Sequence, residues 1–223
     1  MTTANCAVLL NTKVNIETAN QEELIAAFEQ RITAICMIRA EKANLDPESD
    51  VVKHQISAII DWLRSTDFYT APASTRFHDS EPIGLLRHSL NVYNQALDIK
   101  NLPKFSKVSL DSIALVSLCH DLCKIGLYSS YMRNVKNEET GVWEKVPSYK
   151  REKPMYPIGH GQASVYILSR FIKLSFEEML AIRWHMGAWY VCDSEMDDLQ
   201  KSNEDYPLVH LLQFADQLSI VNY

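Results

Sequence analysis

The strongest constraint on the fold is that apolar residues recur every three or four positions, which gathers them on one face of an α-helix. The clearest case runs from Gln21 to Ala43, where Asn20 and Glu23 have the spacing of a helix-capping box. The same periodicity predicts further helices over residues 49–64, 84–100, 110–127, 159–171, 175–185 and 208–218. The expected fold class is therefore all-α.

One stretch departs from the helical rhythm. Apolar and polar residues alternate from Val142 to Val146, and the segment from Asn137 to Gly141 has the composition of a turn. We therefore expect a small β-hairpin or lid inserted around residues 128–157. The turn-rich segment from Ala71 to Pro82 predicts a loop long enough to carry functional residues.

Length and composition limit the domain count and the possible partners. A chain of 223 residues with 47% hydrophobic and 22% charged residues fits one globular domain with a small appendage. We expect an N-terminal helical extension over residues 1–48, packed on a core domain over residues 49–223. The net charge of -6 gives no general attraction to long duplex nucleic acid, so phosphate must be met locally.

The cysteine pattern and the apolar runs bear on location. The five cysteines form no CxxC pair, which argues against a disulfide framework or a zinc ribbon. No uninterrupted apolar run approaches the roughly 18 residues that span a bilayer. We therefore expect a cytoplasmic protein with no membrane partner. Cys119 and Cys123, one helical turn apart, are expected to be packing residues rather than metal ligands.

The central chemical signal is His120-Asp121, near the end of an apolar helix. Ionisable groups in a core-facing segment need partners, and a divalent cation satisfies a neutral imidazole and a carboxylate together. Other apolar helical segments each carry an isolated polar residue: His88, His160, His185 and Asp216. A lone histidine of this kind is more often a hydrogen-bonded core residue. The joint pattern favours a metal site.

The order His, His-Asp, His, His, Asp resembles the binuclear members of the HD superfamily of metal-dependent phosphohydrolases, over roughly residues 62–220. The resemblance implies an HD-domain helical bundle binding one or two divalent ions, which can be manganese, iron, magnesium, cobalt or nickel. It implies a first metal position held by His88, His120, Asp121 and Asp216. A second position would be held by His160 and His185, with Asp121 bridging the two.

A narrower resemblance covers the stretch from Phe68 to Leu90. It looks like the HD domain of bacterial 3'-5' exoribonucleases and related conjugation or phage hydrolases. The chain departs from that pattern at two positions, since Arg87 stands where an acidic residue is usual and Ile83 where a glycine is usual. Neither is a metal ligand, so the departures bear on substrate choice.

Four residues are candidates for catalysis or substrate binding. Asp121 would help to activate the water, and Lys124, four residues after His120 and expected on the same helix face, could neutralise a phosphate oxygen. The hairpin segment is locally basic, and Arg133 is the preferred phosphate contact there, although such residues can simply form a solvated face. His78 lies in the loop and could contact substrate or cap a helix. Trp184, Trp189 and Tyr190 flank His185 and are expected to pack around the site rather than stack on a base.

The function that these features favour is metal-dependent hydrolysis of a phosphomonoester or phosphodiester in a nucleotide, a short oligonucleotide or another phosphorylated small molecule. Two metals can supply a water nucleophile near neutral pH and stabilise both oxygens of an in-line displacement. Two alternatives stay open. Some binuclear HD proteins use a di-iron centre to activate oxygen, and a catalytically idle HD fold could bind a nucleotide as a regulator.

Overall fold

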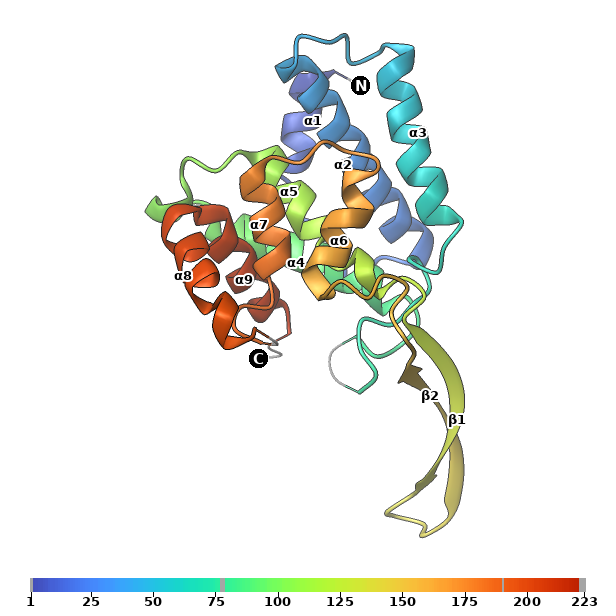
Figure 1. Ribbon diagram of the computed structural model, residues 1–223. Coiled ribbons are helices and arrows are strands. Elements are labelled where there is room, and N and C mark those ends of the chain that lie inside the picture. Colours follow the sequence, from blue (N-terminus) through green and yellow to red (C-terminus); the bar gives the residue numbers. More distant parts are fainter. Residues whose placement is uncertain (1, 77–78, 190, 221–223) are drawn as a thin grey trace.

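The computed structural model describes residues 2–76, 79–189 and 191–220, and it is mainly helical, as predicted. Figure 1 shows a helical body from which a single β-hairpin projects. The helices are α1 (Thr3–Leu10), α2 (Gln21–Lys42), α3 (Asp50–Arg64), α4 (Gly84–Ile99), α5 (Leu110–Cys119), α6 (His160–Ser169), α7 (Phe176–Trp184), α8 (Met196–Asp205) and α9 (Pro207–Ser219), with single 3-10 turns η1 (Pro103–Phe105), η2 (Leu122–Lys124) and η3 (Asp193–Glu195).

Capping boxes fix the start of two of the described helices. Asn20 and Glu23 form a complete capping box at α2, and Ser175 and Glu178 form another at α7. Two helices were not predicted from the sequence. The short α1 carries only two buried residues, and α8 is an acidic, polar segment that also buries only two, so neither shows a clear apolar stripe.

The helix expected over residues 110–127 is wrong in its second half. Helix α5 ends at Cys119 with His120 as its C-cap, and Asp121 has φ -108° and ψ 21°, which is outside helical geometry. The chain then makes the short turn η2. Lys124 therefore does not follow His120 on a continuous helix face.

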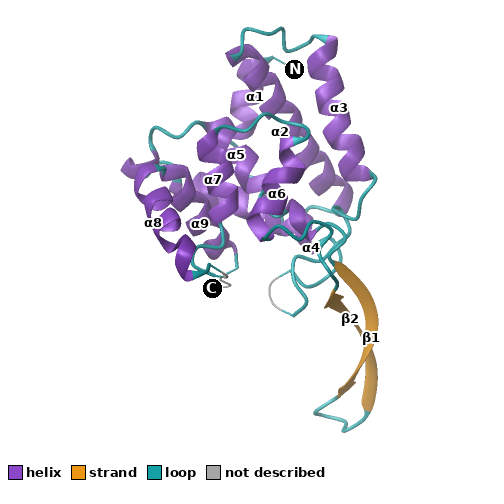
Figure 2. Cartoon of the chain, viewed as in Figure 1, coloured by secondary structure: helices purple, strands orange, loops and turns teal. Residues whose placement is uncertain are grey.

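The predicted hairpin is confirmed. Strand β1 (Tyr128–Lys136) pairs antiparallel with β2 (Trp143–Arg151), with Tyr128 opposite Arg151 at one end and Lys136 opposite Trp143 at the other. The side-chain oxygen of Asn137 accepts hydrogen bonds from two backbone N–H groups of the connecting turn. Figure 2 shows both strands extending away from the helices, so only the Tyr128–Arg151 end adjoins the body.

One hydrophobic cluster joins the helices. It extends along the chain from Cys6 to Ala215, so residues on both sides of position 49 contribute to it. Helix α4 packs on α5 and α9, α7 packs on α6 and α9, and α5 also contacts α7. None of the described helices has both the length and the apolar character needed to cross a membrane.

Candidate metal centre

The six predicted ligands come from five helices or their ends and meet in one place. His88 lies on α4, His120 caps α5, His160 begins α6, His185 caps α7 and Asp216 lies on α9, while Asp121 follows directly after His120. Three overlapping groups have candidate ligand atoms within 4.8 Å of one another: His88 with His120 and Asp216, His120 with Asp121 and His185, and Asp121 with Cys123 and His160. Buried groups that could hold a metal ion are therefore present.

Close helix packing brings His160 and His185 together. A side chain at Gly161 would put its Cβ 2.3 Å from the carbonyl oxygen of Arg183, so only glycine lets α6 approach the backbone of α7 this closely. The Nε2 atom of His160 lies 2.9 Å from Oδ1 of Asp121, and that of His185 lies 3.5 Å from the same oxygen.

The other oxygen of Asp121 faces the other two histidines. Its Oδ2 lies 3.4 Å from Nε2 of His88 and 3.3 Å from Nε2 of His120. These two Nε2 atoms are 3.2 Å apart, and Oδ1 of Asp216 is 3.2 Å from that of His88. The two carboxylate oxygens of Asp121 thus divide the histidines into the two pairs that the resemblance assigns to separate metal positions.

The histidines are oriented with Nε2 toward the centre. Nδ1 of His120 lies 2.9 Å from the carbonyl oxygen of Ser117, and Nδ1 of His185 lies 2.7 Å from that of Ile182. A carbonyl can only accept, so each Nδ1 carries a proton and the Nε2 of a neutral ring has a free lone pair. Metal-binding histidines are commonly held this way.

Among the buried side-chain atoms of the described residues that lack a hydrogen-bond partner, one belongs to a candidate metal ligand. The Nε2 of His185 is buried and unsatisfied, although its ring is anchored through Nδ1. Buried polar atoms in native proteins are nearly always satisfied. Two ligands that are each about 2.1 Å from one ion lie about 3.0–3.4 Å apart in octahedral or tetrahedral geometry, which matches most distances in the cluster. The residues therefore fit a divalent ion.

The charges of the cluster also favour a cation. Burial opposes ionisation of Asp121, but Lys124 and the nearby imidazoles outweigh it and hold the pKa well below its usual range. The pKa of Asp216 is likewise lowered, against the effect of burial, by His88. For His88, burial lowers the pKa, but hydrogen bonds to the two carboxylates outweigh it and raise the pKa to about 9. Two carboxylates thus face Lys124 and a protonated His88, and a metal ion that bound His88 would take the place of its proton.

Lys124 contacts the cluster, but through a turn that the sequence did not predict. Its Nζ lies 2.7 Å from Oδ2 of Asp121, and its side chain is only 12% exposed. Burial opposes the charge of the ammonium group, but Asp121 outweighs this effect and raises the pKa of Lys124. The expected proximity to the site is present, although η2 rather than a helix face creates it.

Cys123 is a site residue that the sequence analysis assigned to packing. Its Sγ lies 3.2 Å from Nδ1 of His160, so it occupies the place that backbone carbonyls take at His120 and His185. Burial raises the pKa of this thiol to about 12. Cys119 is fully buried in the hydrophobic cluster, as expected. Spacing alone could not separate the two cysteines, because the chain changes direction between them.

A pocket of about 350 Å³ opens beside the cluster. Its lining includes Lys124, Tyr128, Arg151, His160 and Met186, so it gives access to His160 of the second pair and to the buried ammonium group. Arg151 is the hairpin cation at this pocket, whereas Arg133 pairs with Val146 farther along the hairpin and is not part of the lining. His78 and Tyr190 lie outside the described residues. Trp184 is buried and Trp189 is exposed.

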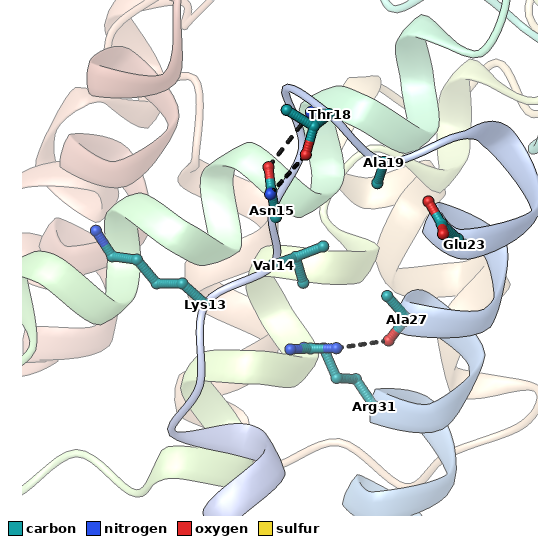
Figure 3. A pocket seen from close by; sticks show the side chains of 8 residues that line it. All are labelled: Lys13, Val14, Asn15, Thr18, Ala19, Glu23, Ala27 and Arg31. Atoms are coloured by element: carbon teal, nitrogen blue, oxygen red, sulfur yellow. Dashed lines mark hydrogen bonds between the residues drawn. The ribbon is translucent and has the colours of Figure 1, made fainter.

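A larger pocket, of about 460 Å³, lies between residues 13–19 and helix α2 (Figure 3). The described residues that line it include none of the six predicted ligands. The guanidinium of Arg31 donates to the backbone oxygens of Ala27 and Thr12, and Asn15 bonds Thr18. These groups tie the segment to α2 and leave no constellation for chemistry.

Helix α4 begins at a tight turn. Ile83 has φ 62° and ψ 4°, a left-handed conformation that is strained for a β-branched residue. The next residue, Gly84, would put a Cβ 2.0 Å from the carbonyl oxygen of Asp79. This tight turn directs α4, and therefore His88, toward the cluster.

Comparison of the chain with protein-family models, with curated proteins and with solved structures gave no match in any of the three.

Proposed function

We propose that this protein is a metal-dependent phosphohydrolase of the HD type, acting on a phosphomonoester or phosphodiester of a nucleotide or short oligonucleotide. The observation that carries the proposal is the convergence of four histidine Nε2 atoms on the two oxygens of Asp121, beside a buried lysine and an accessible pocket. His88, His120, Asp121 and Asp216 would hold one ion. His160, His185 and Asp121 would hold a second.

The chemistry follows from the charges that line the pocket. A bound divalent ion lowers the pKa of a water molecule, so that hydroxide is available near neutral pH. That hydroxide would bond to phosphorus as the ester P–O bond breaks, and the leaving oxygen would take a proton from solvent. Lys124 and Arg151 are cations at the pocket and suit the negative charge that builds on phosphate oxygens in the transition state. The oxygenase alternative gives these two cations no comparable role.

Metal counting and a substrate screen test the proposal. Protein purified without chelator is analysed for metal and assayed on nucleotides, short oligonucleotides and simple phosphodiesters with manganese, magnesium, cobalt, nickel or iron. We expect about two ions per chain, and about one in His185→Ala with the fold retained. A protein that hydrolyses no phosphoester under these conditions, yet consumes oxygen together with a substrate, would be an oxygenase instead.

A further inference from the structure

The two faces of the β-hairpin differ in chemistry. Residues alternate between faces along a strand, and paired residues share a face. The register therefore puts Tyr128, Ser130, Met132, Asn134 and Lys136 of β1 on one face with Trp143, Lys145, Pro147, Tyr149 and Arg151 of β2. We call this the Trp143 face. The opposite face, which we call the Arg133 face, carries Ser129, Tyr131, Arg133, Val135, Glu144, Val146, Ser148 and Lys150.

Charge and aromatic rings concentrate on the Trp143 face. It has three cations, Lys136, Lys145 and Arg151, and no acidic residue among its paired positions, all of which are described. It also has three aromatic residues, Tyr128, Trp143 and Tyr149. The Arg133 face has one aromatic residue, and its two cations are partly offset by Glu144 and by the ion pair of Lys150 with Glu152.

Apolar side chains near the tip are exposed. Trp143 is 67% exposed and Met132 is 55% exposed, in a hairpin that projects away from the helical core (Figure 1). At the other end, Tyr128 and Arg151 line the pocket beside the candidate metal centre. The Trp143 face is therefore a strip of aromatic rings and cations that runs from the tip of the hairpin to the pocket.

We infer that the Trp143 face binds single-stranded nucleic acid and guides it to the metal centre. Aromatic rings stack on unpaired bases of any sequence, while interspersed cations follow the phosphate backbone. At about 3.3 Å per residue, the strip is about 26 Å long, which is enough for several nucleotides. The inference rests on the proposed function for what happens to the strand at the pocket, and it names single strands as the substrate class.

Binding is measured by fluorescence anisotropy of labelled 12-nucleotide oligo(U) and oligo(dT) with phosphorothioate linkages, which resist hydrolysis, and the metal-loaded protein. A gel checks that the probe stays intact. We expect binding that Trp143→Ala weakens about tenfold, since stacking on one ring is lost. Lys145→Ala should lower the slope of log affinity against log salt by about 0.7, as for one lost phosphate contact on a single strand. Circular dichroism checks that both variants fold.

Arg133→Ala is the matched control, because it removes the same charge from the same hairpin but from the other face. It should weaken binding less than threefold and leave the salt slope unchanged. The inference is overturned if Arg133→Ala costs as much as Lys145→Ala, if Trp143→Ala binds like wild type, or if a blunt duplex binds as tightly as a single strand. It is also overturned if anionic phosphatidylserine vesicles bind and oligonucleotides do not.

The test separates this inference from the proposed function. Hydrolysis of bis(4-nitrophenyl) phosphate requires the metal centre but offers no strand to the hairpin. Oligonucleotide binding that depends on Trp143, without any phosphoester hydrolysis, would support the inference and remove the proposed function. Hydrolysis of the small diester without oligonucleotide binding would do the opposite.

Discussion

Two buried clusters of charge lie at opposite ends of the same pair of helices. Helix α5 carries Asp111 in its first turn and His120 at its end, and α7 carries Glu178 in its first turn and His185 at its end. In the first cluster, Arg39 of α2 bonds Glu178, and Lys42 lies 2.5 Å from Asp111. We call it the salt-bridge cluster, and we call the other the histidine cluster.

The two clusters differ in how their charges are balanced. In the salt-bridge cluster two carboxylates meet two cations, and Ser112 adds a 2.6 Å hydrogen bond to Glu178. In the histidine cluster two carboxylates meet one lysine and four imidazoles, whose Nε2 atoms converge on Asp121 and could bind an ion. Helix C-terminal ends carry partial negative charge, which adds to the preference for a cation there. The first cluster can be complete in the protein alone, whereas the second is suited to a ligand.

The largest expected effect is at the centre of the histidine cluster. Asp121→Asn removes the charge that all four histidines and Lys124 face, so both metal positions should be lost. We expect kcat/KM on a phosphodiester to fall at least about 10³-fold, or roughly 4 kcal/mol. Metal analysis and steady-state kinetics check this. Asp197→Asn, the same change at an exposed position, is the control, and wild-type metal content in the Asp121 variant would contradict the assignment.

The salt-bridge cluster should instead govern stability. Glu178→Ala removes one of the two carboxylates that Arg39 faces, together with the capping box of α7, and loss of such a buried ion pair costs about 3 kcal/mol of unfolding free energy. Urea denaturation measures the loss, and metal content per folded chain should stay at the wild-type value. The neighbouring Glu177→Ala loses one hydrogen bond to the backbone N–H of Leu208 and should cost about 1 kcal/mol. A Glu178 variant that keeps its stability but loses metal would contradict this division, because it would show that the salt-bridge cluster takes part in metal binding.

Lys124 tests whether the histidine cluster is built for phosphate. Lys124→Ala should keep both metals but lower the rate on phosphoesters about 10²-fold, or roughly 2.7 kcal/mol, because a cation beside the pocket is lost. Stopped assays with saturating metal measure the rate, and the exposed Lys107→Ala is the control. Loss of metal in the Lys124 variant would mean that the lysine holds Asp121 in place and does not act on substrate.

The sequence predicted the histidine cluster better than its surroundings. Polar residues within apolar helical segments indicated all six candidate ligands. Burying such groups without partners costs free energy, so their presence in an apolar segment stands out in the sequence. The salt-bridge cluster was missed, because Arg39, Lys42, Asp111 and Glu178 all lie near helix ends, where charged residues are ordinary. Only tertiary packing shows that they meet.

The local backbone geometry around the site was the hardest feature to predict from the sequence. The break at Asp121 decides where Lys124 and Cys123 point, yet the apolar pattern runs through it without a glycine or proline to mark it. The hairpin was predicted from alternation, but its register was not, so the sequence favoured Arg133 where the structure brings Arg151 to the pocket. A shift of one residue in the pairing register moves a side chain to the other face of the hairpin. The composition of the strands does not determine that register.

The smallest expected effect is the pH dependence of the salt-bridge cluster. Burial raises the pKa of Asp111, but the hydrogen bond and charge of Lys42, with Arg39, outweigh it and the net pKa is lowered. A carboxyl whose folded pKa is depressed adds stability above its unfolded pKa of about 3.9, and this stability is lost as pH falls through the folded pKa. Lys42 is half exposed, which limits the contribution to about 1 kcal/mol. The difference in unfolding free energy between wild type and Asp111→Asn should therefore be constant from pH 7 to 5 and shrink below pH 4. Urea denaturation across that range measures it, and any effect of the histidine cluster cancels because both proteins share it. A difference that grows with acidity would mean that Asp111 is held by its neutral hydrogen bonds and not by its charge.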